Sequence, residues 1–102
     1  MAHVLLVDDD AGTRSALARF VGRQGHTVSH AANAAEAATA LGRGRFDLVI
    51  TDLHMGGISG LGLLKAIRSH PVLRGTPVIM ATSETSSDTV RQAKNAGVDA
   101  FL

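Results

Sequence analysis

The chain has 102 residues and a mass of 10.6 kDa, which is enough for one domain with a modest hydrophobic core. Ten basic and nine acidic side chains leave a formal net charge of +1, which gives the whole molecule no strong attraction for nucleic acid or an anionic membrane. Cysteine, tryptophan and tyrosine are absent and the apolar runs are short, which excludes disulfides, thiol chemistry, a stacking platform for single-stranded nucleic acid and a transmembrane span.

The first predicted elements are a strand at residues 4–7 and a helix at residues 11–24. The strand is apolar at every position, which is typical of a strand buried on both faces of a parallel sheet. In the helix, apolar residues recur at helical spacing, and Leu17, Phe20 and Val21 are expected to face the core. The chain therefore begins with one strand and one amphipathic helix.

The same alternation continues to the end of the chain. Asn33 and Glu36 predict the start of the second helix, because an Asn cap followed three residues later by Glu is a helix-start signal. Pro71 is expected to end the third helix, because the residue before a proline disfavours helical geometry. Further strands are expected at residues 27–30, 47–52 and 77–82 and from residue 99, with helices after Asn33, after Gly60 and at 88–96.

Strict alternation of strand and helix predicts an α/β fold with a doubly wound, parallel, five-stranded sheet and helices on both faces. We expect a single domain over residues 1–102, truncated within the fifth strand, so that the last helix is absent from this chain. The missing end would leave part of one sheet face uncovered, as an apolar patch. The residues after Met1 include neither a basic leader nor an apolar signal core, so the cytoplasm is the expected location.

Polar residues end three of the expected strands at the carboxyl edge of the sheet, where ligands bind in open parallel sheets. Asp8 and Asp9 follow the first strand. Asp52 ends the third strand and Thr82 the fourth. If the first and third strands are neighbours, three carboxylates converge and need a cation, and oxygen-only ligands suit a hard ion such as Mg²⁺. A single aspartate here is most simply a helix cap, which would explain Asp10, but the three together favour a site.

Five stretches, in a consistent order and spacing, resemble the receiver domain of two-component response regulators, of the chemotaxis-regulator type. The resemblance covers essentially the whole chain and implies a flavodoxin-like sheet with the strand order 2-1-3-4-5. The matching stretches are residues 4–10 together with Arg14, 46–55, 60–68, 77–84 and 96–102.

The resemblance implies a phosphoacceptor and a Mg²⁺ site. Asp52 would be the phosphoacceptor, attacking the phosphorus of a phosphohistidine on a sensor histidine kinase or a phosphotransfer protein. Asp9 would coordinate Mg²⁺ directly and Asp8 mainly through a metal-bound water. Asp52 and the backbone carbonyl of His54 would supply further metal ligands. No other cofactor is implied.

The resemblance also implies a switch and a set of partners. The hydroxyl of Thr82 would donate to a phosphoryl oxygen, and the rotamer of Phe101 would follow Thr82. The chain would then be a signalling module and not an enzyme acting on a separate metabolite. Its partners would be the kinase or phosphotransfer protein, an output domain or downstream protein and, in some settings, a second copy. No direct contact with nucleic acid or membrane is expected.

Two departures from the family pattern leave alternatives open. The family usually has a phosphoryl-binding lysine shortly after the fifth strand, beyond Leu102, and Gly56 stands where a proline commonly follows Met55. One alternative is therefore a receiver-like docking fragment that is not phosphorylated. Another is a phosphatase of the haloacid-dehalogenase kind, whose Asp-x-Asp-x-Thr motif is one residue out of register with residues 8–13 and whose cap domain has no room here.

Overall fold

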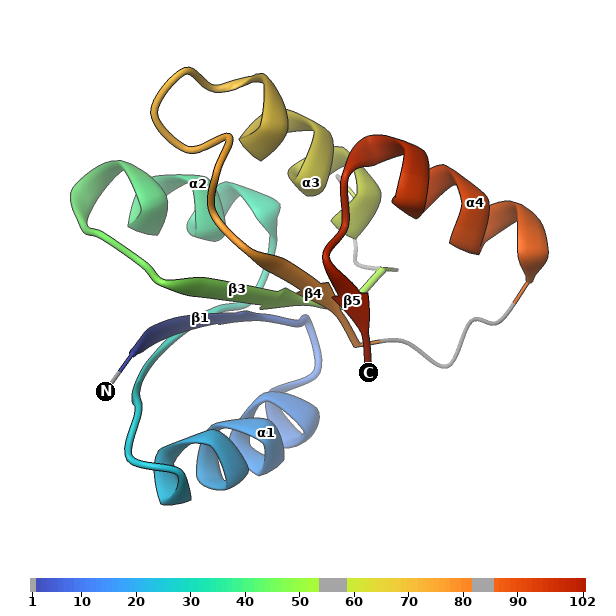
Figure 1. Cartoon of the computed structure of the whole chain (residues 1–102). Coiled ribbons are helices and arrows are strands. Elements are labelled where there is room, and N and C mark those ends of the chain that lie inside the picture. Colours follow the sequence, from blue (N-terminus) through green and yellow to red (C-terminus); the bar gives the residue numbers. More distant parts are fainter. Residues whose placement is uncertain (1, 54–58, 82–85) are drawn as a thin grey trace.

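Five strands form one parallel sheet in the order β2-β1-β3-β4-β5 in the computed structural model of the chain, which describes residues 2–53, 59–81 and 86–102. Helix α1 lies on one face of the sheet, and α2, α3 and α4 lie on the other (Figure 1). The predicted α/β class and strand order are thus confirmed. The strands are β1 (His3–Val7), β2 (Thr27–Ala31), β3 (Leu48–Thr51), β4 (Val78–Met80) and β5 (Ala100–Phe101), and the helices are α1 (Ala11–Arg23), α2 (Ala34–Arg43), α3 (Gly60–Ser69) and α4 (Ser87–Ala96).

The register of the central strands places the ends of β1 and β3 side by side. Val7, the last residue of β1, pairs with Thr51, the last residue of β3. Just beyond this pair, the Asp52 amide donates to the Val7 carbonyl at 3.0 Å, and the Asp8 amide donates to the Ala31 carbonyl at 3.1 Å. The backbone hydrogen bonds of the sheet therefore fix where residues 8 and 52 leave it.

The sheet separates two apolar layers, because successive residues of a strand point to opposite faces. On the side of α2, α3 and α4, the buried core includes Leu5, Val49 and Met80. On the side of α1, the buried residues Val4, Leu6 and Ile50 form a smaller cluster. Residues 4–7 of β1 are all buried, which explains why this part of the strand is apolar at every position.

Helix ends follow the predicted capping signals. Asp10 is the N-cap of α1 and accepts from the amides of Gly12 and Thr13. Asn33 is the N-cap of α2, with its side-chain oxygen 2.8 Å from the Glu36 amide, while the Glu36 carboxylate accepts from the Ala32 amide at 2.9 Å. These contacts satisfy backbone groups that the first turn of a helix leaves without partners.

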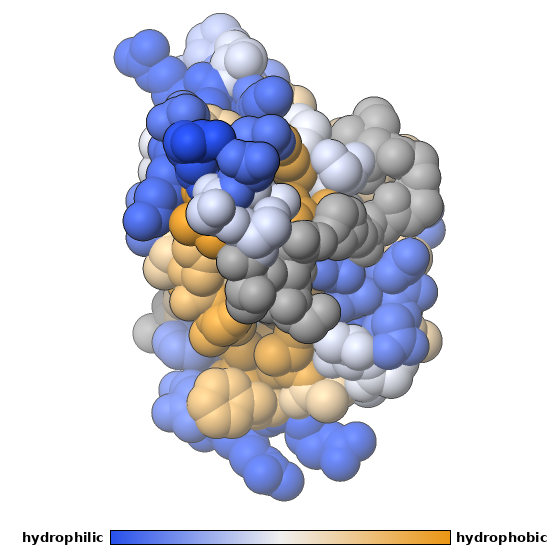
Figure 2. Space-filling model, turned by 90° about the vertical axis from the view of Figure 1, so that its right-hand side faces the viewer, coloured by the Kyte–Doolittle hydropathy of each residue, from blue (hydrophilic) through white to orange (hydrophobic). Residues whose placement is uncertain are grey.

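One core prediction is wrong, because Phe20 is 63% exposed. Leu17 and Val21 of the same helix do pack against the smaller cluster. Helix α1 contacts β1 and β2, and no second helix lies beside it on this face in the described part of the chain, so Phe20 has nothing to pack against. Figure 2 shows apolar surface gathered in the middle and lower parts of the view, toward the level of α1.

None of the helices in the described residues combines the length and the apolar character needed to cross a bilayer.

Candidate functional site

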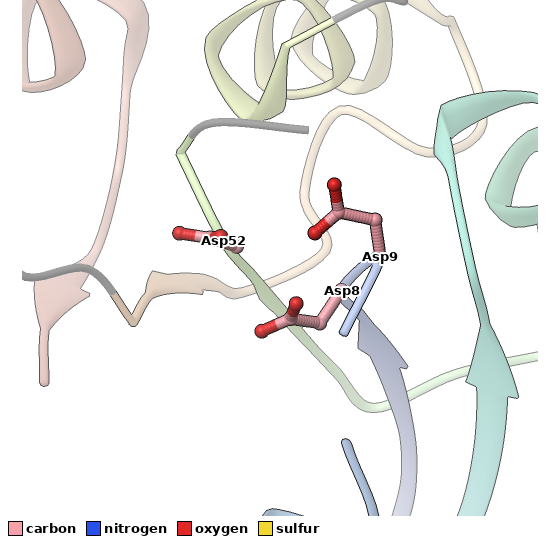
Figure 3. Close-up of side chains that lie close together, drawn as sticks. All are labelled: Asp8, Asp9 and Asp52. Carbon is pink, nitrogen blue, oxygen red and sulfur yellow. The ribbon is translucent and has the colours of Figure 1, made fainter. Parts of the chain in front are cut away.

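Three carboxylates meet where β1 and β3 end. Asp8 and Asp9 follow β1 directly, and Asp52 follows β3 (Figure 3). One carboxylate oxygen from each residue lies within 4.8 Å of the corresponding oxygens of the other two. The structure therefore brings these side chains together, as the sequence predicts for neighbouring first and third strands.

The three carboxylates differ in exposure and in hydrogen bonding. Asp8 is buried, and its Oδ1 accepts from the Asp10 amide at 2.9 Å. Asp52 is half-buried, and its Oδ1 accepts from the Leu53 amide at 2.8 Å. Asp9 is exposed. The cluster is thus anchored on its buried side by Asp8 and opens to solvent through Asp9.

Burial raises the pKa of Asp8 above its ordinary value, and the negative charges of Asp52, Asp9 and Asp10 raise it further. The hydrogen bond from the Asp10 amide acts in the opposite direction and offsets part of this effect. The ionised form of Asp8 is therefore destabilised in the folded chain. A bound cation would reverse that balance, because it stabilises the charged form of each carboxylate.

Asp10 belongs to the helix cap and not to the carboxylate cluster. A hydrogen bond from the Thr13 hydroxyl lowers the pKa of Asp10, and the amides of Gly12 and Thr13 lower it further. Its carboxylate is thus stabilised as an anion by the first turn of α1. The interpretation of Asp10 as a helix cap is confirmed.

The donor set of Asp8, Asp9 and Asp52 fits a hard divalent cation. All three side chains offer carboxylate oxygens, the ligands that such ions prefer. The nearby guanidinium of Arg14 does not take the place of a cation, because its Nη1 donates to the backbone carbonyl of Asp8 at 2.6 Å and not to a carboxylate. The three carboxylates could therefore hold a metal ion.

The other predicted site residues are only partly described. Phe101 lies in β5, opposite Met80 of β4, where it is half-buried against the larger core. His54 and Thr82 lie outside the described residues. The residue before Thr82 is described: the Ala81 amide donates to the Thr51 carbonyl at 3.0 Å, which brings the end of β4 to the edge of the sheet where β3 ends.

Gly60 shapes the site, a role that its place in the matching stretch 60–68 does not reveal. A Cβ atom at this position would lie 2.0 Å from the backbone oxygen of Asp52, far closer than real atoms approach. The Gly60 amide also donates to the Leu53 carbonyl at 2.8 Å. The first residue of α3 must therefore be glycine for the helix to start this close to Asp52. The glycine-rich stretch before the helix was the available signal.

The sequence and the fold of the chain both match those of a known family. The chain matches the family described as "Response regulator receiver domain" over residues 4–102. It is 33% identical to the chemotaxis protein CheY of Pseudomonas aeruginosa over 100 residues, which cover 97% of this chain and 81% of that protein. The crystallised chemotaxis protein CheY4 of Vibrio cholerae superposes with a TM-score of 0.94 at 33% identity, covering 100% of this chain and 85% of that one.

A longer relative shows the same domain inside a larger protein. The sensory/regulatory protein RpfC of Xanthomonas campestris is 34% identical over 102 residues, which cover 98% of this chain but 14% of that protein. The chain thus spans about one seventh of the length of this relative.

Proposed function

Because the chain belongs to the response regulator receiver domain family, we propose that it is a phosphoaccepting signal receiver in which Asp52 takes a phosphoryl group from a histidine kinase or a phosphotransfer protein. The observation that carries this proposal is the convergence of the Asp8, Asp9 and Asp52 carboxylates within 4.8 Å of one another at the ends of β1 and β3. An acceptor carboxylate beside two further carboxylates is an arrangement suited to metal-assisted phosphoryl transfer.

The proposed reaction is an in-line displacement at phosphorus. An oxygen of Asp52 forms a bond to phosphorus while the bond from phosphorus to the donor imidazole nitrogen breaks, and the imidazole keeps that electron pair. The Leu53 amide holds Oδ1 of Asp52, and Oδ2 has no hydrogen-bond partner within the described ranges, so the proposal assigns the attack to Oδ2. The hydrogen bond from the Asp52 amide to the Val7 carbonyl supports this assignment, because it holds the backbone from which the carboxylate projects.

The proposal includes Mg²⁺, with Asp9 and Asp52 as direct ligands, Asp8 acting mainly through water and the His54 carbonyl as a further ligand. When bound, the ion offsets the charge that the acceptor and the phosphoryl oxygens bring together. The chain itself contributes the placement of the ligands, through the paired ends of β1 and β3. The raised pKa of Asp8 supports this role, because a group whose anion is destabilised in the free chain gains most from a nearby cation.

The proposed output is a change around Thr82 and Phe101. The Thr82 hydroxyl would donate to a phosphoryl oxygen, and Phe101 would follow it by changing rotamer, which biases a two-state surface around α4 and β5. The half-buried position of Phe101 supports this role, because a side chain that is not enclosed has room for a second rotamer. An attached output domain, a downstream protein or a second copy would read the surface, in the cytoplasm, where this family usually works.

The phosphatase alternative is not favoured by the geometry. Its motif would use Asp8 and Asp10 as the paired carboxylates. The Asp10 carboxylate instead accepts hydrogen bonds from Gly12 and Thr13 as the cap of α1. The carboxylate that joins the cluster comes from β3, as the receiver proposal requires.

The proposed function is tested by labelling with a small phosphodonor. Incubation with acetyl phosphate and MgCl₂ should add the mass of one phosphoryl group, and chelation with EDTA should prevent it. Asp52→Asn should abolish the label, whereas Asp88→Asn, which changes an exposed aspartate on α4, should keep it. A label that persists at the wild-type level in Asp52→Asn contradicts the assignment.

A further inference from the structure

A groove lies beside the amino-terminal ends of β3 and β4, at the opposite end of the strands from the carboxylates. Helices α2 and α3 run side by side there (Figure 1). The groove consists of two adjoining hollows of about 670 and 370 Å³, which share Leu41, Gly42, Val72 and Leu73 in their walls. We call the pair the α2–α3 groove. Each hollow lies in the size range of pockets that hold ligands.

The smaller hollow is mainly apolar. It is lined by apolar side chains from α2, α3 and the loop after α3, together with His70. Val72, in that loop, is 82% exposed, although large aliphatic side chains are more often buried. The apolar side chains in its wall include Ala38, Leu41, Ala66, Ile67, Val72 and Leu73.

The loop that presents Val72 is fastened in place. Nδ1 of His70 accepts from the Val72 amide at 3.1 Å and from the Leu73 amide at 3.3 Å. Nη1 of Arg68 donates to the carbonyls of Arg74 at 3.0 Å and Thr76 at 2.6 Å. Val72 is therefore held in solvent by an ordered loop, so its exposure is not the result of a frayed segment.

Three glycines in the groove wall keep it open without being required by the backbone. A Cβ atom on Gly42, Gly44 or Gly75 would meet nothing within 4 Å, and none of the three has a positive φ angle. Larger residues would thus fit the fold but would reach into open space at the groove. Helical Gly42 even costs stability relative to alanine. An open groove is what these glycines provide.

Basic side chains flank the apolar hollow. The larger hollow is lined by Arg43 and Arg45 against a single carboxylate, Asp47, which accepts from the His3 amide at 2.8 Å. Arg74 lies in the same loop as Val72 and is exposed. Neither Arg43, Arg45 nor Arg74 forms an ion pair with any residue of the described segments. The rim thus carries unpaired positive charge beside an apolar surface.

We propose that the α2–α3 groove docks an acidic peptide segment of a partner protein, with an apolar side chain in the smaller hollow and carboxylates against Arg43 and Arg45. An apolar anchor with charges around it is a common mode of peptide recognition. The charge of the rim selects acidic over basic partners and favours fast association. The groove lies at the opposite end of the strands from Asp52, so docking and phosphorylation can occur on the same molecule.

The test begins with selection from a phage-displayed library of random peptides on the immobilised chain. Selected peptides should combine apolar residues with two or more Asp or Glu. A fluorescein-labelled selected peptide should lose about tenfold or more in affinity on Val72→Ser, on Arg43→Glu with Arg45→Glu, and on Gly42→Leu, by fluorescence anisotropy. Its affinity should also fall with added salt, because exposed charges are screened.

The matched control reverses the charge of two exposed arginines of α1, in the variant Arg19→Glu with Arg23→Glu. It should leave the affinity for the selected peptide unchanged. All groove variants should keep wild-type circular dichroism and wild-type labelling of Asp52, which separates this proposal from the function above. The proposal is overturned if no peptide is selected, if the selected peptides lack carboxylates, or if the variants bind them like the wild type. It is also overturned if ultracentrifugation shows a dimer of the chain that Val72→Ser dissociates, because the groove would then belong to a second copy.

Discussion

The sharpest consequence of the carboxylate cluster is that Asp8→Asn should stabilise the metal-free chain. Two unit charges 4.8 Å apart repel by roughly 3.5 kcal/mol at an effective dielectric constant of about 20, and by roughly 0.9 kcal/mol in bulk water. Asp8 is 6% exposed and has two carboxylate neighbours, whereas Asp9 is exposed and is screened by solvent. We therefore expect Asp8→Asn to raise the free energy of unfolding by about 1–3 kcal/mol. The asparagine oxygen can still accept from the Asp10 amide.

The assay is thermal unfolding in EDTA and in MgCl₂. In EDTA the variant should melt at least about 4 °C above the wild type, because 1 kcal/mol shifts the midpoint of a domain of this size by about that much. Mg²⁺ at about ten times its dissociation constant should stabilise the wild type by about 1.4 kcal/mol and the variant by much less. Asp88→Asn, which changes an exposed aspartate on α4, should not raise the melting temperature in EDTA and should keep the wild-type response to Mg²⁺. A variant that melts below the wild type in EDTA refutes the reasoning.

The pH dependence of this difference has a defined sign. The pKa of Asp8 in the folded chain is raised above its ordinary value of 3.8, so between these two values the folded chain binds more protons than the unfolded chain. The stability of the wild type therefore falls as the pH rises through that window. Below pH 3.8 Asp8 is protonated in both states, and the advantage of Asp8→Asn over the wild type should disappear.

Three further predictions concern the packing around the site and the fold. Gly60→Ala should lower the melting temperature and slow phosphoryl labelling, because the added Cβ would meet the backbone oxygen of Asp52 at 2.0 Å; unchanged labelling would contradict that role. Arg68→Ala should lower the free energy of unfolding in urea by about 2–3 kcal/mol, because the Arg68 guanidinium donates to three backbone carbonyls and one carboxylate. Arg91→Ala, which removes an exposed ion pair with Asp88, should lower it by less than about 1 kcal/mol. Phe20→Ser should cost less than about 1 kcal/mol, because the ring is 63% exposed, and a larger loss would show that it is buried in solution.

The fold was predictable because local signals and long-range pairing agree. Strands β1, β3 and β4 are short, mostly apolar runs, and the helix starts carry recognisable caps such as Asn33, so the alternation could be read without knowing the contacts. Phe20 shows the limit of this approach. Its spacing places it on the apolar side of α1, but spacing does not tell what lies opposite that side. Burial depends on a second surface, and that surface is a property of the assembled sheet.

The α2–α3 groove was not predictable, because its parts come from separate segments. Arg43 and Arg45 look like a solvated turn in the sequence, and Val72 looks like an ordinary loop residue. The groove arises only because the loop after α2 and the loop after α3 end at the same edge of the sheet. Hydrogen bonds from Arg68 and to His70 then fix the second loop in place.

The run of Asp8, Asp9 and Asp10 shows how position in the fold divides chemically identical residues. The chain leaves a strand and enters a helix within these three residues, so each carboxylate points to different surroundings. Asp10 meets the free amides of the first turn of α1, which stabilise its anion. Asp8 meets low-dielectric surroundings and the charge of Asp52, which destabilise its anion. These different surroundings are the physical reason that Asp10 acts as a cap while Asp8 belongs to a site that a cation would stabilise, and the opposite pKa shifts of the two residues follow from them.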